Sequence, residues 1–214
     1  MMQNNLIDFW NQRHEKLGSY SGGDKGISDF ENFEFYIHRL SIVLKLIGKY
    51  NTWKRPLDIL DAGCGKGFFS NALLSAGYLV VGIDSSLSAI NFCKEKYPQI
   101  FFQQCELNDF FLPKSFDVIV CIDVMFHIVE NILWENSVKN LAYHAKNNSI
   151  IIISDFVDAV DNESEIGDKV KYIKYRNKKK YITILEKFGF LLQEVIPYNI
   201  LSNKNSFMIF QRKG

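Results

Sequence analysis

The stretch Asp61-Ala62-Gly63-Cys64-Gly65-Lys66-Gly67 decides the fold of this 214-residue chain. It follows the mostly apolar run 57–60 and precedes a helical pattern at 68–76, so we expect it to join a strand to a helix. Three glycines at alternate positions let the backbone turn tightly and approach a ligand that a β-carbon would exclude. In α/β folds such a loop lies at the carboxyl edge of the sheet, where ligands bind. The alternative is a glycine-rich surface turn.

Strands alternate with helices on both sides of this loop. The expected strands are 57–62, 78–83, 100–105, 116–122 and 149–154, and the expected helices are 68–76, 87–97, 132–145 and one ending at 188. Continuous apolar strands indicate a sheet covered on both faces. Two last strands, 190–197 and 206–212, are joined by 199–205, a link short enough to require an antiparallel pair. The sequence therefore predicts an α/β fold with a Rossmann-like, doubly wound sheet, mostly parallel, with a reversed C-terminal strand.

The remaining segments complete the expected organisation. Apolar residues at three- and four-residue steps predict two helices in the first 52 residues, separated by a glycine- and serine-rich loop. The length suits one domain. We therefore expect a single domain over 1–214, with a helical cap at 1–56, a cofactor-binding core at 57–214 and an acceptor-side insert at 157–180.

Composition narrows the possible partners. Hydrophobic residues make up 47% of the chain and charged residues 23%, which is typical of a compact globular protein. Lys plus Arg (25) nearly cancels Asp plus Glu (24), so the net charge of +1 argues against a nucleic-acid or membrane partner. No secretory leader or membrane span is expected. Four cysteines without a C-x-x-C pair predict reduced thiols, no metal site and a cytoplasmic location. No feature specifies an oligomeric state.

Small differences in the glycine loop decide between ligands. A dinucleotide fingerprint needs Gly or Ala where Phe68 stands, and a P-loop needs Ser or Thr where Gly67 stands, so NAD and ATP are both disfavoured. Asp84 ends the second strand, where a carboxylate can accept hydrogen bonds from both hydroxyls of a ribose. Glu106 and the N–H of Leu107 follow the third strand. An adenosine lying across these strand ends would be held at its sugar and its base.

With these motifs in order, the chain from about Leu57 to Arg212 resembles the class I S-adenosylmethionine-dependent methyltransferases. The resemblance implies that S-adenosylmethionine (SAM) is the cofactor and S-adenosylhomocysteine (SAH) the product, with no metal required. It implies that Asp61 orients the amino group of the cofactor, Asp84 binds the ribose, and Glu106 and Leu107 hold the adenine. The full set of expected cofactor residues is Trp10, Arg13, Asp61, Gly63, Cys64, Gly65, Gly67, Asp84, Ser85, Glu106, Leu107, Ile122 and Asp123.

Two of these residues come from the expected N-terminal lid. In related small-molecule enzymes an N-terminal helix folds over the cofactor, and Trp10, Arg13, Tyr36 and Arg39 are candidates for that contact. Trp10 and Tyr36 also lie on apolar stripes, so packing in the core is the alternative for both.

His127 is the best-placed candidate for a catalytic base. It follows the fourth strand in Asp123-Val124-Met125-Phe126-His127, where the transferred methyl group should point. A hydroxyl acceptor would benefit from a base. The alternative is a histidine that caps or packs the following helix.

The expected function is methyl transfer to an oxygen or nitrogen of a small molecule by in-line displacement. The N-terminal pattern Phe9-Trp10-Asn11-Gln12-Arg13-His14 resembles bacterial methyltransferases of natural-product or surface-glycan pathways, which favours a natural product or sugar intermediate as acceptor. Two alternatives stay open. One is an RNA methyltransferase that uses the basic stretch 169–180, and the other is an inactive partner protein that keeps the fold.

Overall fold

The computed structural model describes residues 2–18, 20–24, 26–50, 55–157, 173–198 and 205–213. The expected link at 199–204 and residues 158–172 of the expected insert lie outside this part of the chain. The described chain divides into two compact units, unit 1 at residues 1–106 and unit 2 at residues 107–214. The single domain predicted for 1–214, with its cap and insert, stays a prediction.

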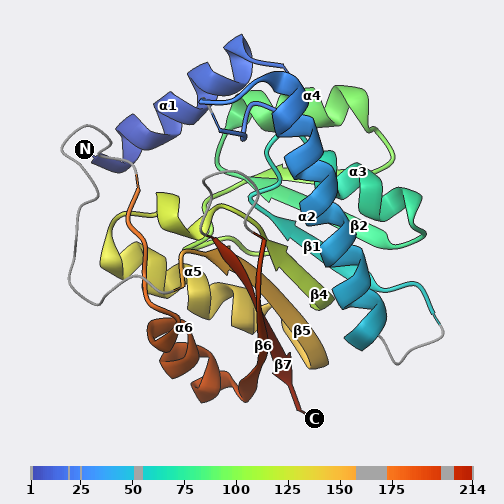
Figure 1. Cartoon of the computed structure of the whole chain (residues 1–214), viewed down its shortest axis with the longest axis vertical. Helices are drawn as coiled ribbons and strands as arrows, with labels where there is room; N and C mark the ends of the chain where they lie inside the picture. Colours follow the sequence, from blue (N-terminus) through green and yellow to red (C-terminus); the bar gives the residue numbers. More distant parts are fainter. Residues whose placement is uncertain are drawn as a thin grey trace. The chain divides into compact units, whose positions relative to one another are not determined.

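Unit 1 combines the two N-terminal helices with three parallel strands. Its elements are α1 (Met2–Lys16), α2 (Asp29–Tyr50), β1 (Asp58–Ala62), α3 (Phe68–Ser75), β2 (Leu79–Asp84), α4 (Leu87–Lys96) and β3 (Phe101–Gln104). The strand order is β3-β2-β1, with β2 parallel to both neighbours. Helix α1 packs against α4, at the top of the view in Figure 1. The helices and strands expected here are confirmed to within two residues at most ends.

Local chemistry sets the ends of these helices. The hydroxyl of Ser86 caps α4 by accepting the N–H of Ala89 (3.2 Å). After α3, Gly77 adopts a left-handed conformation (φ 91°) and its N–H donates to the carbonyl of Leu74. A glycine at this position ends the helix without a steric penalty and turns the chain into β2.

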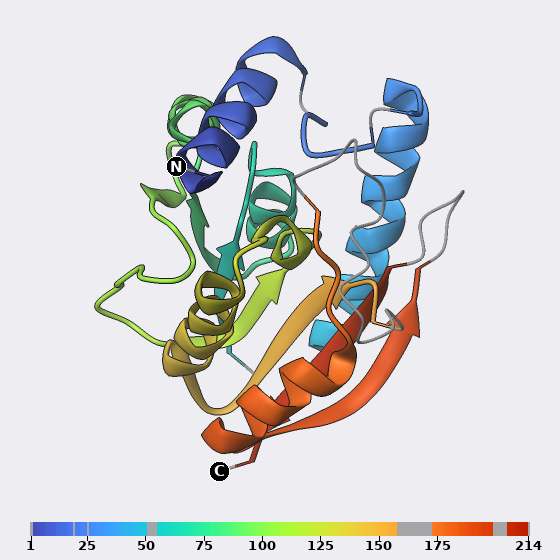
Figure 2. The same ribbon diagram turned by 90° about the vertical axis from the view of Figure 1, so that its left-hand side faces the viewer.

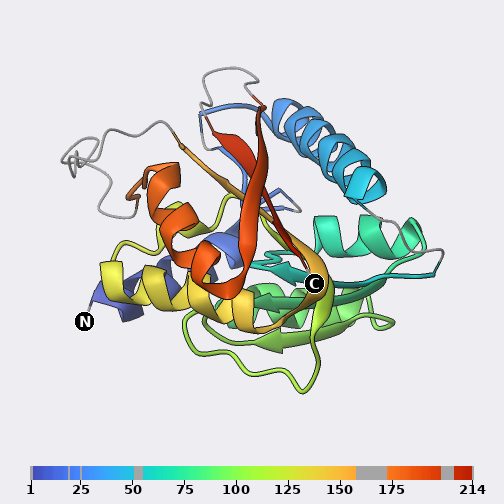
Figure 3. The ribbon, with the colours of Figure 1, turned by 90° about the horizontal axis from the view of Figure 1, so that it is seen from below.

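Unit 2 contains strands β4 to β7 and the helices between them. Its elements are β4 (Phe116–Cys121), the 3₁₀ turn η1 (Met125–His127), α5 (Asn131–Tyr143), β5 (Ala145–Asp155), α6 (Lys178–Leu185), the 3₁₀ turn η2 (Glu186–Phe188), β6 (Phe190–Pro197) and β7 (Ser206–Arg212). The strand order is β4-β5-β7-β6, and β7 is antiparallel to both of its neighbours. Figure 2 shows the β6 and β7 pair with α6 beside it, and Figure 3 shows α5 packed against α6.

Strand β5 differs from the expectation at its start. It begins at Ala145, four residues before the predicted 149, because Phe116 pairs with Ala145 across an irregularity in the ladder. Within this extension Asn148 has a positive φ of 60°, a conformation that asparagine tolerates better than most residues. From Ile150 to Ile153 the strand is fully apolar and buried, as its sequence predicts.

The parallel strands of unit 1, together with the parallel β4 and β5 and the reversed β7 of unit 2, confirm the predicted Rossmann-like fold class. In the described part of the chain, no helix combines the length and the apolar character needed to cross a membrane.

Candidate functional site: the glycine loop and the end of strand β4

The glycine loop of unit 1 has the backbone that its sequence predicts. Gly63, Gly65 and Gly67 all have positive φ values (83°, 50° and 76°), which side chains rarely permit. The N–H groups of Gly63 and Cys64 both donate to the carbonyl of Ile83 (2.7 and 2.9 Å), which ties the loop to the end of β2. The loop is therefore a fixed backbone surface at the carboxyl ends of β1 and β2.

Asp84 closes this surface from the end of β2. Its Oδ2 accepts the N–H of Gly65 (2.8 Å), and its Oδ1 accepts the N–H of Ser86 (2.8 Å). A carboxylate has about four lone-pair sites, so the half-buried Asp84 can accept two further donors. An oriented carboxylate beside a glycine backbone is a donor and acceptor set that fits the ribose and methionine parts of SAM. Ser85 lies within this turn.

Asp61 lies deeper than the other expected cofactor residues. It is buried, and its Oδ2 accepts the hydroxyl of Ser70 from α3 (2.6 Å). Burial raises the pKa of Asp61 to about 7, although the Ser70 hydrogen bond acts in the opposite direction. The structure gives Asp61 a partner within the protein, and its contact with the cofactor amino group stays a prediction.

The two expected lid residues on α1 have well-defined surroundings. The guanidinium of Arg13 donates to the carbonyls of Ser21 and Gly23 in the loop that follows, and it lies 5.7 Å from the centre of the Trp10 ring. Arg13 therefore holds the loop against α1. The cofactor contacts of Trp10 and Arg13 stay predictions. On α2, Tyr36 is buried against α3, in agreement with the packing alternative.

Two residues that sequence reasoning did not assign to the cofactor site connect α1 to the glycine loop region. Asn11 accepts hydrogen bonds from the hydroxyl of Ser86 (2.9 Å) and the N–H of Ser88 (3.3 Å). His14 is buried, and its Nδ1 lies 2.7 Å from the hydroxyl of Ser21. No periodicity distinguishes them, because their partners lie in other segments.

Glu106 and Leu107 stand where the two units divide. Glu106 is half-buried at the end of unit 1, and Leu107 is buried at the start of unit 2, where its carbonyl accepts the side chain of Asn140 (3.2 Å). Their roles toward adenine stay predictions.

In unit 2, Asp123 is the centre of a polar cluster after β4. Its φ is positive (56°), and its N–H donates to the hydroxyl of Ser154 (2.6 Å). Its Oδ1 accepts hydrogen bonds from Ser154 (2.9 Å), Tyr198 and Asn205 (3.2 Å). These donors come from β5 and from both ends of the β6 and β7 link, so they hold the left-handed turn that follows the buried Ile122.

His127 ends the short turn η1 that follows this cluster. Its N–H donates to the carbonyl of Val124 (2.9 Å), and its half-buried ring lies 4.5 Å from that of Phe126. The ring of Tyr175 is 5.3 Å from both Phe126 and Phe156. The buried Phe126 adjoins His127, and the half-buried Tyr175 connects it to the half-buried Phe156, so the carboxyl end of β4 in unit 2 has an aromatic wall (Phe126, Phe156, Tyr175).

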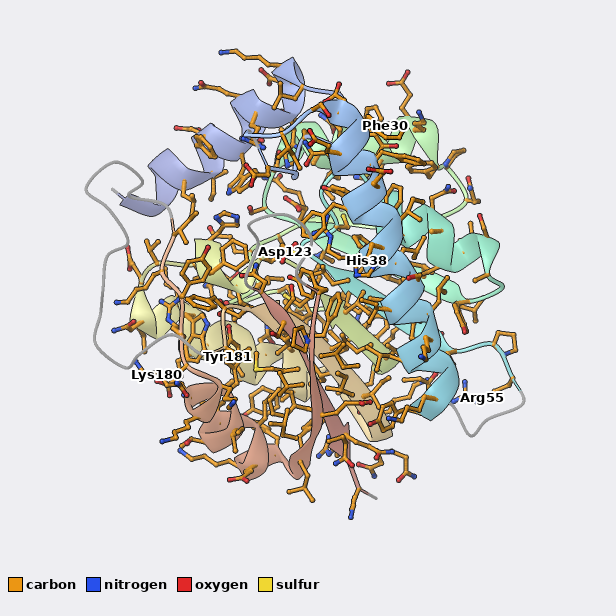
Figure 4. The ribbon with its side chains drawn as sticks, in the orientation of Figure 1. Phe30, His38, Arg55, Asp123, Lys180 and Tyr181 are labelled. Atoms are coloured by element: carbon orange, nitrogen blue, oxygen red, sulfur yellow. The ribbon has the colours of Figure 1, made fainter. Side chains whose placement is uncertain are left out.

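Asp155 and Arg176, the chain neighbours of Phe156 and Tyr175, belong to a buried polar network. The hydroxyl of Tyr181 donates to Asp155 Oδ2 (2.5 Å) and accepts the indole N–H of Trp134 (3.2 Å). Arg176, also buried, stacks 4.9 Å from the Trp134 ring centre. In Figure 4, Tyr181 and Lys180 mark the buried and exposed sides of the first turns of α6. The network fixes the segment that carries Tyr175.

The buried acid of this network should make stability depend on pH. Burial raises the pKa of Asp155 from 3.8 to about 7, so between about pH 4 and pH 7 the folded chain binds a proton that the unfolded chain lacks. The free energy of unfolding therefore falls as pH rises through this window. We expect Asp155→Asn to remove about 3 kcal/mol of the fall between pH 5 and pH 8. The raised pKa of Asp61 acts in the same direction, and the lowered pKa of His14 acts in the opposite direction below pH 6.5.

Urea unfolding of both proteins at pH 5 and pH 8 checks this expectation. The exposed Asp109 offers a matched control, and Asp109→Asn should leave the pH dependence unchanged. An equal fall in wild type and Asp155→Asn would mean that Asp155 is ionised throughout.

Comparison with known proteins agrees with this geometry. A family model described as "Methyltransferase domain" matches residues 59–148. Residues 59–148 of the chain are thus similar to a methyltransferase domain. This match confirms the resemblance predicted from the glycine loop and Asp84, and the matched residues also include Glu106, Asp123 and His127.

Curated proteins similar to this chain include ubiquinone biosynthesis O-methyltransferases. The protein from Rickettsia canadensis (strain McKiel) is 35% identical over 117 residues, which are 53% of this chain and 48% of that protein. The protein from Rickettsia akari (strain Hartford) is 33% identical over 128 residues, which are 55% of this chain and 50% of that protein. The chain thus spans about half the length of the curated relatives it matches.

Solved structures share the fold over a longer part of the chain. Magnesium protoporphyrin IX methyltransferase from Synechocystis PCC 6803 with bound SAM has a TM-score of 0.72 at 19% identity, and the match covers 98% of this chain and 96% of that one. N-methyltransferase NodS from Bradyrhizobium japonicum WM9 with SAH has a TM-score of 0.67 at 16% identity, with coverage of 84% and 88%. At these identities the likeness concerns the fold alone.

The basic stretch expected to serve RNA binding is only partly described. Within its described part, Arg176 is buried and donates to the carbonyls of Lys174 and Val129 (both 3.0 Å). Lys179 and Lys180, which follow the matched region in the sequence, are exposed. Arg176 is therefore committed to internal contacts, which removes one cation from the expected cluster.

Proposed function

We propose that this chain is a SAM-dependent methyltransferase that transfers a methyl group to an oxygen of a small molecule. The observation that carries the proposal is the geometry of Asp84 and the glycine loop. Asp84 is held by two backbone N–H groups and keeps acceptor capacity, while three left-handed glycines expose the adjacent backbone. Solved neighbours of this fold bind SAM or SAH at low sequence identity.

The residues of the chain bind and orient the cofactor, which itself supplies a methyl group activated by a sulfonium. Asp84 would accept hydrogen bonds from both ribose hydroxyls of the cofactor, and the glycine loop would lie against its methionine part. Glu106 and the N–H of Leu107 would hold the adenine, and Asp61 would orient the amino group. Ile122 and Asp123, after β4, would lie beside the sulfonium. These roles follow the family resemblance and the order of the motifs.

Two features favour oxygen over nitrogen as the methyl acceptor. The two curated relatives described above, of which the match covers about half, are O-methyltransferases. His127 lies beside the aromatic wall, where it could accept a proton from a hydroxyl as the methyl group is transferred. Aromatic side chains favour a planar, apolar acceptor through stacking. A natural product or sugar intermediate that carries a phenolic ring would match both features.

Binding of SAH is the first test. A ligand at 100 times its Kd stabilises the folded state by about 2.7 kcal/mol, which corresponds to a rise in Tm of roughly 5 to 10 °C for a chain of this size. We expect SAM and SAH to raise Tm and NAD to have no effect. A rise with NAD alone would contradict the proposal, and no rise with any of the three would favour an inactive partner protein.

The acceptor is sought by mass spectrometry. Incubation with SAM and a pool of phenolic, amine and sugar compounds should produce a mass gain of one CH₂ on a phenolic compound. Methylation of amines alone would retain the enzyme class and overturn the preference for oxygen. Methylation of RNA alone would instead support the RNA alternative.

A further inference from the structure

Buried polar side chains connect helix α1 to the rest of unit 1. His14 is only 4% exposed, and its Nδ1 lies 2.7 Å from the hydroxyl of Ser21, which is also buried. The Trp10 ring, one helical turn earlier on the same face of α1, stacks on the imidazole with 5.7 Å between the ring centres and an interplanar angle of 28°. A polar ring buried in this way is held in one orientation.

The imidazole of His14 lies against the glycine loop. A β-carbon built on Gly65 would be 3.7 Å from Cε1 of His14, so the imidazole faces Gly65 and would touch a side chain added there. The N–H of the same Gly65 donates to Oδ2 of Asp84 (2.8 Å). His14 therefore faces the residue whose N–H holds Asp84 within unit 1.

Asn11 provides a second, independent connection one turn earlier on α1. Its Oδ1 accepts the hydroxyl of Ser86 and the N–H of Ser88. The N–H of Ser86 donates to Oδ1 of Asp84 (2.8 Å). Helix α1 is therefore bonded through Asn11 to Ser86, which holds Oδ1 of Asp84. Through His14 it faces Gly65, which holds Oδ2.

We propose that His14 is a positioning residue of the cofactor site, which joins α1 to the glycine loop and holds Asp84 in the orientation that binds the ribose. Asn11 provides the second connection between α1 and the residues that hold Asp84. This proposal rests on the proposed function, because it concerns the same cofactor. The Asp84 carboxylate would bind two ribose hydroxyls only in one orientation. A carboxylate already held in that orientation loses less conformational entropy when the ribose binds.

The charges around His14 suggest when the connection is stable. The groups that face the imidazole are Asp84 at the end of β2, Lys66 in the glycine loop and Arg13 on α1 itself. Burial lowers the pKa of His14 below 6.5, Lys66 and Arg13 lower it further, and Asp84 opposes them. The ring is therefore neutral at pH 7.5. Protonation at lower pH would add a buried cation beside two others.

The sign of the pH effect follows from this shift. Because the folded pKa of His14 is below the unfolded value of 6.5, the unfolded chain binds more protons as pH falls. The stability that His14 contributes is fully present above pH 6.5 and is lost as pH falls toward the folded pKa of His14. Since the positioned loop is what binds the cofactor, affinity for SAH should fall in the same window.

The test measures SAH affinity by calorimetry from pH 5.5 to pH 8, with Tm recorded at each pH. We expect His14→Gln to weaken binding about tenfold at pH 7.5, the effect of one lost contact network, and to flatten the pH profile. Asn11→Ala should weaken binding by a similar factor and retain the pH profile. Asp8→Asn, at an exposed position on the same helix, should match wild type in both respects.

Each outcome decides the proposal. Wild-type affinity and an unchanged pH profile in His14→Gln would overturn it. If His14→Gln does not fold, Ser21→Ala removes the hydrogen-bond partner of the imidazole without altering α1 or the glycine loop, and an unchanged affinity would overturn the proposal in that case. Failure of wild type to bind SAH at any pH would instead contradict the proposed function, so the two failures are distinguishable.

Discussion

Replacing Asp84 by Asn should weaken the binding of SAH about 100-fold. The two ribose hydroxyls would exchange a charged acceptor for a neutral one, and hydrogen bonds to charged groups are worth about 1.5 to 3 kcal/mol each. The substitution also disturbs the loop itself. Both oxygens of Asp84 already accept backbone N–H groups, from Gly65 and Ser86, and an amide has only one acceptor oxygen. One of these N–H groups would face an NH₂ group.

Calorimetric titration with SAH measures this effect directly, and thermal unfolding reports the cost to the fold. Asp58 is a matched control, because it begins β1 at the opposite end of the strands from the glycine loop. Asp58→Asn should keep SAH affinity within about twofold of wild type. Equal affinities of wild type and Asp84→Asn would mean that the ribose is bound elsewhere, and the proposed cofactor site would be wrong.

The fold could be predicted from the sequence because its main features are periodic or local. Apolar runs such as 150–153 identify buried strands, and the short interval between 197 and 206 requires an antiparallel pair. The early start of β5 could not be predicted in this way. It depends on Ala145 pairing with Phe116 and on a left-handed Asn148, which are properties of the ladder as a whole.

The candidate site likewise contains residues that a local motif predicts and residues that only long-range contacts bring together. Gly63, Gly65, Gly67 and Asp84 belong to a motif with a fixed spacing, so their arrangement follows from the sequence. The links made by Asn11 and His14 do not, because Asn11 bonds to Ser86, 75 residues later in the chain. Polar contacts over such separations leave no periodic pattern, and a buried histidine on a helix resembles any other residue of that helix.

The Asp123 cluster shows how the two kinds of information combine in unit 2. The sequence places Asp123 after β4, but its three side-chain donors come from residues 154, 198 and 205, which no motif connects. Their convergence holds the left-handed turn in place. The orientation of the following η1 turn, and hence of His127, therefore depends on the C-terminal strands as well as on β4.

Replacing His127 by Gln should lower kcat for a phenolic acceptor about 100-fold or more, while SAH affinity stays within about twofold of wild type. A positioned general base contributes roughly 10²- to 10⁴-fold to a rate, and glutamine keeps the size of the side chain without its basicity. The loss should be smaller for a more acidic phenol, which is already partly ionised and needs less help from a base. A residue that merely packs η1 would affect both acceptors equally.

Steady-state kinetics with two phenols of different acidity, together with SAH titration, separate these cases. His144 is a matched control in the same unit, because its buried imidazole accepts the N–H of Leu112 (3.2 Å) and packs 4.2 Å from the Phe110 ring. His144→Gln should therefore lower Tm and leave kcat within about twofold, since it removes a structural hydrogen bond. If His127→Gln gives this same pattern, His127 is a packing residue, and the proton must leave the acceptor by another route.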